Sequence, residues 1–296
     1  MNWADASAGW SWNPLTDLQQ IWAFPFMVNA FRAGTVVAVL AAVMGWFMVL
    51  RRQSFAGHTL AVVSFPGAAC ATLLGIGAGF GYFAFCIGGA LVIAAIPRAG
   101  QGGSGQESAL TSTIQTFLLA CGFLFVALYK GFLGGVNSLL FGSFLGITTD
   151  QVVMLTIVAA LALGVLAVIG RPLLFASVDE AVAAARQVPV RVLGFVFLIL
   201  VGACAAEASQ AVGSLLLLGL LAAPAGAASR LTDRPYHSLA LSAGLAVAEM
   251  WAGLALSYYV PQLPPSFAIM AVATTIYAVA LIAVRRPHAH GALAEA

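Results

Sequence analysis

The stretch Arg171-Pro-Leu-Leu-Phe-Ala-Ser-Val-Asp-Glu-Ala-Val-Ala-Ala-Ala-Arg-Gln-Val-Pro-Val-Arg191 is a polar island between two long apolar runs. Ser177 and Glu180 have capping-box spacing, and Asp179 and Glu180 suit the positive end of a first helical turn. A Val-Pro pair follows Arg186 and ends the pattern. The stretch therefore predicts a helix of about two turns at the cytoplasmic face of a membrane. An ordinary loop between two spans is the alternative.

Composition places the rest of the chain in lipid. Of 296 residues, 62% are hydrophobic and only 7% are charged, whereas a globular surface needs about a quarter of residues charged. Apolar runs of about 20 residues predict membrane-spanning helices, and no alternating barrel pattern is present. We therefore expect an all-α, polytopic membrane protein. The four scattered cysteines have no CxxC spacing and are expected to be packing residues.

Apolar periodicity predicts about nine spans, with eight as the nearest alternative. The predicted spans cover residues 26–50, 57–76, 79–97, 109–129, 151–170, 192–208, 211–229, 238–259 and 266–284. Residues 1–25 lack a signal-peptide pattern and are expected to lie at the interface. Residues 26–286 then form the transmembrane domain, and 287–296 form a basic cytoplasmic tail.

Basic residues orient the spans. With nine spans and an external N-terminus, ten of the twelve Lys and Arg residues fall on the cytoplasmic side. Lys130 is external, and Arg32 lies within or at the outer edge of the first span. We also expect a flexible cytoplasmic loop at 98–108 and a short interfacial or re-entrant helix at 137–146.

Two spans carry a proline beside small residues at mid-membrane depth. Pro66 precedes Gly67, and Pro224 stands two residues before Gly226. Each proline removes a helical hydrogen bond, and each glycine permits close backbone approach. The two segments are candidates for helix breaks that line a transport pathway. Simple small-residue packing is the alternative interpretation.

Three ionisable residues besides Arg32 fall within or at the ends of spans: His58, Glu207 and Glu249. A carboxylate in hydrocarbon costs roughly 2.5–3.5 kcal/mol on insertion scales, so each is a candidate for function. Glu249 lies near the middle of its span. Glu207 lies near a predicted outer end, where a solvated position is the alternative. His58 begins its span at the cytoplasmic end, and imidazole is a common ligand of divalent transition metals.

Five stretches in this order resemble the membrane subunits of ATP-binding-cassette importers for zinc, manganese and iron(II). They are Arg51-Arg-Gln-Ser-Phe-Ala-Gly-His-Thr-Leu60 with Phe65-Pro-Gly-Ala68, Leu140-Phe-Gly-Ser-Phe-Leu-Gly146, Asp179-Glu-Ala181 with Val188-Pro-Val190, Ala211-Val-Gly-Ser-Leu-Leu-Leu217 with Pro224-Ala-Gly-Ala-Ala228, and Gly253-Leu-Ala-Leu-Ser-Tyr258. The resemblance covers most of residues 26–285.

The resemblance implies partners and site residues. It implies a homodimer or pseudo-dimer of permeases, two ATPase subunits docked on 171–191, and an extracytoplasmic metal-binding protein. The ATPase-coupling residues would be Ser177, Asp179, Glu180 and Arg186. Many members carry aspartate at the place of His58 and histidine at the place of Val62, so only one of the two ligands is present here. Members also usually have glycine where this chain has Gln187.

These features predict a permease that moves a divalent metal, zinc or manganese, by alternating access across the cytoplasmic membrane. The pathway would pass His58, Glu249 and Glu207, although the residues that bind the metal are not determined. The chain has no G-x-x-x-x-G-K-[ST] motif, so we expect a separate ATPase, no bound cofactor and no nucleic-acid partner. A permease for another cargo, an ion-coupled carrier that uses Glu249, and a non-transporting scaffold are the alternatives.

Overall fold

The computed structural model describes residues 22, 24–95, 104–129, 142, 144–214, 217–260 and 262–283. Within these ranges every regular element is helical, which confirms the all-α prediction. The elements are α2 (Pro25–Leu50), α3 (Ser54–Leu73), α4 (Ala78–Ala95), α5 (Ser104–Leu128), the 3₁₀ turn η2 (Phe144–Gly146), α7 (Thr149–Val178), α8 (Glu180–Ala185), α9 (Val190–Val212), α10 (Leu217–Leu231), α11 (Pro235–Tyr259) and α12 (Pro265–Ala283).

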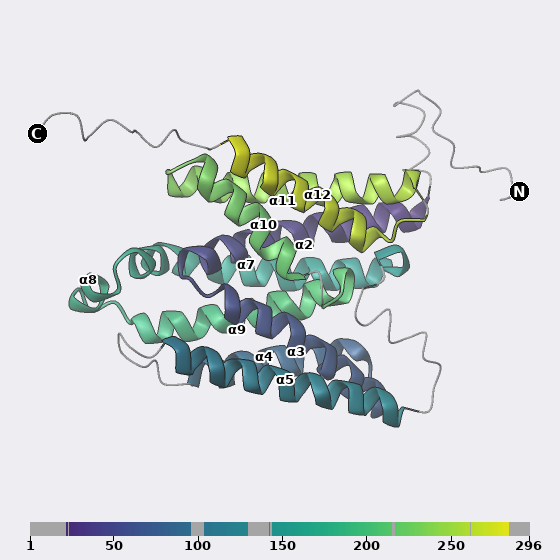
Figure 1. Cartoon of the computed structure of the whole chain (residues 1–296), viewed down its shortest axis with the longest axis horizontal. Coiled ribbons are helices and arrows are strands. Elements are labelled where there is room, and N and C mark those ends of the chain that lie inside the picture. Colours follow the sequence, from purple (N-terminus) through teal and green to yellow (C-terminus); the bar gives the residue numbers. More distant parts are fainter. Residues whose placement is uncertain are drawn as a thin grey trace, which may run out of the picture.

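Eight of the described helices are long and apolar enough to cross a membrane. They coincide with eight of the nine predicted spans. The ninth, predicted at 211–229, corresponds to α10, which has only 15 residues. At 1.5 Å per residue α10 is about 22 Å long, less than the roughly 30 Å of a hydrocarbon core. It nevertheless runs from one end of the molecule toward the other (Figure 1). It follows the end of α9 that lies away from α8, and it leads to the start of α11, which lies on the same side as α8.

The long helices run side by side, and α8 lies at one end of the molecule (Figure 1). The seven described arginines other than Arg32 lie near the helix ends on that side: Arg51, Arg52, Arg171, Arg186, Arg191, Arg230 and Arg234. By the positive-inside rule we expect this side to face the cytoplasm. We call it the inner end and the opposite side the outer end.

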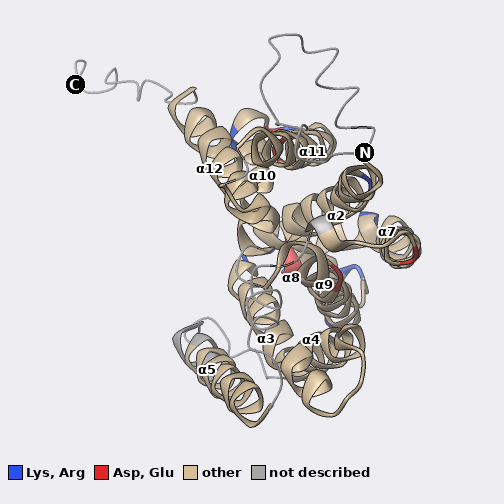
Figure 2. Ribbon diagram, turned by 90° about the vertical axis from the view of Figure 1, so that its right-hand side faces the viewer, with Lys and Arg blue, Asp and Glu red and all other residues tan. Residues whose placement is uncertain are grey.

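The helices form two groups around α2 and α9. On one side α3 packs against α4, α5 and α9, and on the other α11 packs against α2, α10 and α12. A view along the helices shows the two groups apart, with α2 and α9 between them and few charged segments (Figure 2). A polar side chain on α3 and one on α11 therefore belong to different groups of helices.

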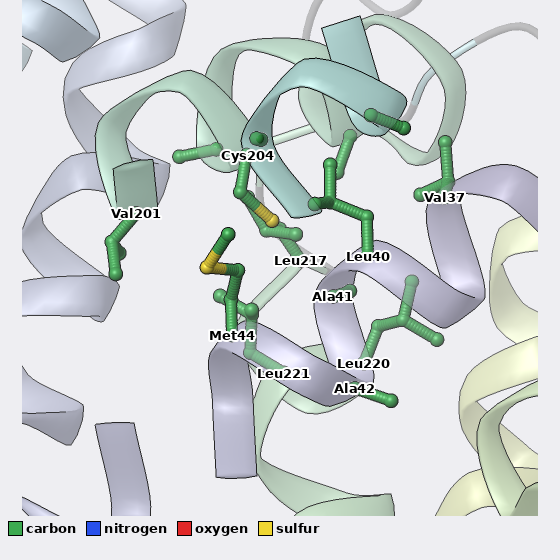
Figure 3. Close-up of a cluster of buried hydrophobic side chains, with 14 of the residues drawn as sticks. Val37, Leu40, Ala41, Ala42, Met44, Val201, Cys204, Leu217, Leu220 and Leu221 are labelled. Carbon is green, nitrogen blue, oxygen red and sulfur yellow. The ribbon is translucent and has the colours of Figure 1, made fainter. Parts of the chain in front are cut away.

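The core lies where α2, α9 and α10 meet. Leu40 and Met44 of α2, Cys204 of α9, and Leu220 and Leu221 of α10 are all fully buried (Figure 3). Alanines and glycines fill much of the rest of the interface, so the backbones come close. A Cβ atom on Gly45 would overlap the Leu221 carbonyl of α10. Such approach through small residues is a usual way for helices to associate in lipid.

Several loop and end predictions meet the structure only in part. The flexible loop predicted at 98–108 is shorter, because α5 already begins at Ser104; residues 98–103 lie outside the described ranges. Most of the predicted re-entrant helix at 137–146 also lies outside them, and its last three residues form η2. Residues 1–21 and the tail 287–296 are likewise outside.

The contact between α3 and α4 gives a test of this packing. A Cβ atom on Gly81 would overlap the Gly67 carbonyl, whereas a Cβ atom on Gly88, also on α4, meets nothing within 4 Å. Overpacking costs about 1–3 kcal/mol. We expect Gly81→Ala to lower the thermal unfolding midpoint of the detergent-solubilised protein by several degrees. Gly88→Ala is the matched control and should leave it unchanged or raise it. Equal midpoints for the two variants would contradict the close α3–α4 contact.

Candidate metal pathway and coupling helix

His58 lies in the first turns of α3, four residues after Ser54 and so about 6 Å from the inner end of that helix. The ring is partly buried, and its Nε2 atom is 3.4 Å from Nε2 of Gln115 on α5. The hydroxyl of the neighbouring Thr59 donates to Oε1 of Gln115 at 2.9 Å. The same hydroxyl also lies 3.1 Å from the Phe55 carbonyl, so its one proton is shared between two acceptors, and the shorter contact favours the Gln115 amide with its NH₂ group toward the ring.

This arrangement orients the imidazole. An amide NH₂ group only donates, so the contact is a hydrogen bond when Nε2 of His58 carries a lone pair. The same lone pair is what a divalent metal ion would use. In that tautomer Gln115 orients the His58 ring, and an ion bound at Nε2 would take the place of the Gln115 amide. Val62, one turn further on, is buried and apolar, so it adds no ligand.

Glu207 and Glu249 are both fully buried. Each has 0% exposure, and none of their carboxylate oxygens has a hydrogen-bond partner among the described residues. The solvated alternative for Glu207 is therefore wrong, because α9 is enclosed near its outer end by the neighbouring helices. A buried carboxylate without a partner is costly unless it is protonated or binds a cation. Both residues remain candidates for contact with an ion or a proton.

The three ionisable side chains do not converge. His58 is near the inner end of α3, and Glu207 is five residues before the outer end of α9. Glu249 is 14 residues beyond Pro235 on α11, about 21 Å along that helix, in the other helix group. Among the described residues no three His, Cys, Asp or Glu side chains lie close enough to hold one metal ion.

The two prolines lie inside continuous helices. Pro66 is internal to α3 and Pro224 is internal to α10, and neither ends its helix. Gly67 faces Gly81 of α4, while a Cβ on Gly226 would come within 3.0 Å of the Tyr277 ring on α12. Both glycines thus lie at contacts between helices. Their part in a pathway stays a prediction.

The predicted capping box at Ser177 and Glu180 is wrong. The apolar residues after Pro172 continue α7 through Val178, so Ser177 is helical and its hydroxyl donates to the Leu173 carbonyl. The N-cap of α8 is Asp179, whose Oδ1 atom accepts from the Val182 N–H at 2.9 Å. Part of the polar island therefore belongs to the inner end of a 30-residue helix.

The predicted helix end after Arg186 is confirmed. Arg186 is the C-cap of α8, the Val188 N–H bonds to the Ala183 carbonyl, and the Gln187 N–H bonds to the Ala184 carbonyl. This is the pattern of a Schellman motif, which needs a left-handed residue just after the cap. Gln187 has φ +60°. Glycine adopts this conformation without the steric cost that a Cβ atom adds.

The surface of α8 combines exposed apolar and charged side chains. Ala183 packs inward, whereas Val178 is 73% exposed and Val182 is 46% exposed. Asp179, Glu180 and Arg186 are exposed beside them. A small apolar surface bordered by charges, beyond the inner ends of the spans, is suited to contact with a protein.

Sequence reasoning missed two residues of this region as functional candidates. Gln115 is not ionisable, so it was not among the candidates chosen by charge. A glutamine inside a predicted span is nevertheless a pattern that indicates a polar contact between helices. Arg51 was counted only as an orienting charge. Its contacts with three different elements depend on how α2, α7 and α9 meet, which no local pattern shows.

Comparison with known proteins gives consistent matches. The ABC 3 transport family matches residues 23–284. A manganese transport system membrane protein of Halalkalibacterium halodurans is 25% identical over 88% of either chain. A chelated iron transport system membrane protein of Yersinia pestis is 27% identical over 82% of this chain and 81% of its own. A probable metal transport system membrane protein of Treponema pallidum is 28% identical over 89% of this chain and 98% of its own.

Solved structures share the fold. PsaBC from Streptococcus pneumoniae in complex with Fab has a chain that superposes with a TM-score of 0.78 at 23% identity, covering 89% of this chain and 94% of that one. A putative metal-chelate type ABC transporter in an inward-facing conformation gives a TM-score of 0.70 at 16% identity, covering 90% of either chain.

The left-handed residue after α8 gives a second test. A non-glycine residue in this conformation destabilises the folded state by roughly 1–2 kcal/mol. Glycine removes this strain, but it also increases the conformational entropy of the unfolded chain, which cancels part of the gain in stability. We expect Gln187→Gly to raise the unfolding midpoint by a few degrees. Gln187→Ala is the control and should not raise it, because alanine keeps the Cβ atom. Equal midpoints for Gln187→Gly and the unchanged protein would contradict the strained turn.

Proposed function

The chain belongs to the ABC 3 transport family, and we propose that, as the permease subunit of an ATP-driven importer, it carries manganese or zinc across the cytoplasmic membrane. The observation that carries the proposal is the family match over 23–284, which includes every helix from α2 to α12. Relatives that match most of this chain are named for manganese and for chelated iron. Uptake of different metals by the reconstituted permease therefore decides which ion is the cargo.

The energy source is on another subunit. The chain is a transport component rather than an enzyme, and its sequence holds no phosphate-binding loop. We infer that a cytoplasmic ATPase docks on α8. The exposed Val178 and Val182, with Asp179 and Glu180 beside them, support this assignment. An extracytoplasmic metal-binding protein would deliver the ion at the outer end.

A second permease copy would complete the pathway. On α3, His58 is the candidate ligand of one chain, and Val62 one turn further on adds none. A two-fold arrangement would bring a second His58 to the route, and imidazole is a common zinc ligand, whereas manganese is bound more often by carboxylates. We therefore propose a homodimer in the cytoplasmic membrane, with lipid around the exposed apolar helices.

The proposed route uses α3 and α9. These helices pack against each other, with Glu207 near the outer end of α9 and His58 near the inner end of α3. A carboxylate at the entrance offsets the charge of a divalent cation, and the His58 imidazole would offer the ion a further ligand near the exit. Glu249 lies across α2 from this pair. Pro66 and Gly67, and Pro224 and Gly226, would adjust the packing of α3 and α10 during alternating access.

One observation favours a second candidate function. Glu249 is a fully buried carboxylate in mid-helix with no hydrogen-bond partner among the described residues. An ion-coupled carrier could use it as its protonation site and would need no ATPase. Uptake that continues without ATP, and that Glu249→Gln abolishes, would favour that carrier. A permease of the same architecture for another cargo would show ATP-dependent uptake of none of the three metals.

Uptake by reconstituted vesicles tests the function. We expect vesicles that hold the permease with its ATPase to take up manganese or zinc, with iron(II) as the third metal compared, and only when ATP is present. His58→Ala should lower this uptake at least tenfold, because the inner part of the route loses its ligand. His58→Asp, which supplies the residue common in the family, should retain most of it.

His237→Ala is the matched control. His237 is the other histidine among the described residues, and it is exposed at the start of α11. Its loss should leave uptake within twofold of the unchanged protein. The proposal is wrong if uptake needs no ATP, and the role of His58 is wrong if His58→Ala transports like His237→Ala.

Docking on α8 has its own test. Replacing Asp179 by Ser and Glu180 by Gln together removes two charges and keeps an N-cap side chain. We expect this double variant to insert normally, yet to lose stimulation of the ATPase and most of the transport. Asp150→Asn, at the outer end of α7, is the control for loss of an exposed acid. Normal coupling in the double variant would remove these two residues from the docking surface.

A further inference from the structure

Arg51 joins three elements at the inner end. It is the C-cap of α2. Its Nη1 atom donates to Oγ of Ser177 on α7 at 3.3 Å, and its Nε atom donates to Oε1 of Gln53 at 3.3 Å. The guanidinium also lies over the Phe197 ring of α9, 5.6 Å from the ring centroid. A planar group with a fork of donors can make these contacts at once, which an ammonium group cannot.

Two of these contacts lead to the functional regions. Ser177 is two residues before Asp179, the N-cap of α8. Gln53 is the N-cap of α3, and its carbonyl accepts from the Gly57 N–H, immediately before His58. Arg51 therefore connects the base of the proposed docking helix to the first turn of the helix that carries the candidate ligand.

The connection between α2 and α3 is short and tightly set. It consists of residues 51–53, and Arg52 is held at φ +56°. The last turn of α2 also contacts the first turn of α3, because a Cβ atom on Gly57 would overlap the Met48 sulfur. This short connection can therefore absorb little displacement of Arg51. When Arg51 moves, the start of α3 must move with it.

A row of aromatic contacts fixes the level at which Arg51 lies. The Phe197 and Phe47 rings make a tilted contact with their centroids 6.2 Å apart, and Phe47 makes an edge contact with Trp46 at 5.0 Å. The Trp46 Nε1 atom donates to Oγ of Ser238 on α11 at 2.9 Å. The row ties α9, α2 and α11 together at the inner end. At this end the hydrogen bond between Arg51 and Ser177 adds a polar link to the packing of α7 against α2 and α9.

We propose that Arg51 is a positioning residue that transmits movement of the α7–α8 junction to the α2–α3 turn and so sets the position of His58. This inference rests on the proposed ATP-driven import. In this proposal Arg51 acts through Ser177 and the α2–α3 turn, and not as a ligand of the ion. If Arg51 only anchored the helix end at the lipid surface, its loss would lower stability or assembly but would not separate ATP hydrolysis from transport.

The test measures uptake and ATP hydrolysis together, in vesicles that hold the complete permease and ATPase complex, with manganese and zinc as probes. We expect Arg51→Gln to lower the ion taken up per ATP hydrolysed at least tenfold, while ATPase co-purification and basal hydrolysis stay within twofold. Arg51→Lys should give a ratio of ion taken up to ATP hydrolysed between those of Arg51→Gln and the unchanged protein. Ser177→Ala should lower the same ratio, and adding it to Arg51→Gln should cause no further fall, because both remove one link.

Arg52→Gln is the matched control. It removes the same charge at the next position, where the side chain is exposed, and it should leave the ratio unchanged. An unchanged ratio in Arg51→Gln, or an equal fall in Arg52→Gln, would overturn the inference. A fall in the ratio that only follows a loss of assembled complex would also overturn it. If Arg51→Gln does not assemble, the ratios measured for Arg51→Lys and Ser177→Ala decide by the same criteria. Failure of the proposed function would show separately, as no ATP-dependent uptake by the unchanged protein.

Discussion

Close backbone approach between helices is the constraint on which the rest of this structure depends. Lipid is as apolar as a leucine side chain, so helices gain little from hiding apolar surface and associate through dispersion contacts that small residues allow. Gly45 against the Leu221 carbonyl, and Gly67 against Gly81, are such contacts. They hold α2 in the middle of the molecule and α3 against α4, and thereby fix the lateral positions of His58 and Arg51.

The same packing accounts for where polar groups are found. Several hydroxyls in the spans donate to the carbonyl four residues earlier, as Thr35, Thr72 and Thr156 do, and so need no partner on another helix. Glu207 and Glu249 cannot satisfy two carboxylate oxygens in that way. Close packing keeps water away from these two carboxylates, so their burial lowers stability. Packing gives no reason to retain them, and they are therefore functional candidates.

The sequence predicts the positions of the helices along the chain far better than it predicts which helices pack against each other. Apolar run lengths were enough to place eight long helices, and the polar stretch 171–191 was enough to place the short helix α8. The end of α8 was also foreseen, because a Val-Pro pair stops a helix locally. The start of α8 was not, since Ser177 has capping chemistry but the preceding apolar turn extends α7 past it. Nor did the chain reveal that Glu249 lies in a different helix group from His58, because spans surrounded by lipid and protein carry little amphipathic pattern.

The dimensions of the inner end suggest why a transport cycle would be driven from there. Helix α8 has six residues, with Asp179 capping its start and a Schellman motif closing its end, so it can move as one piece with little internal deformation. Helix α7 before it extends across the whole bundle, and bending its 30 residues through lipid would spread a displacement over many weak contacts. The Arg51 side chain offers a route of a few ångströms instead, from the end of α7 to the start of α3. Coupling by that route needs movement only at one end, and the densely packed middle of α2 can stay in place.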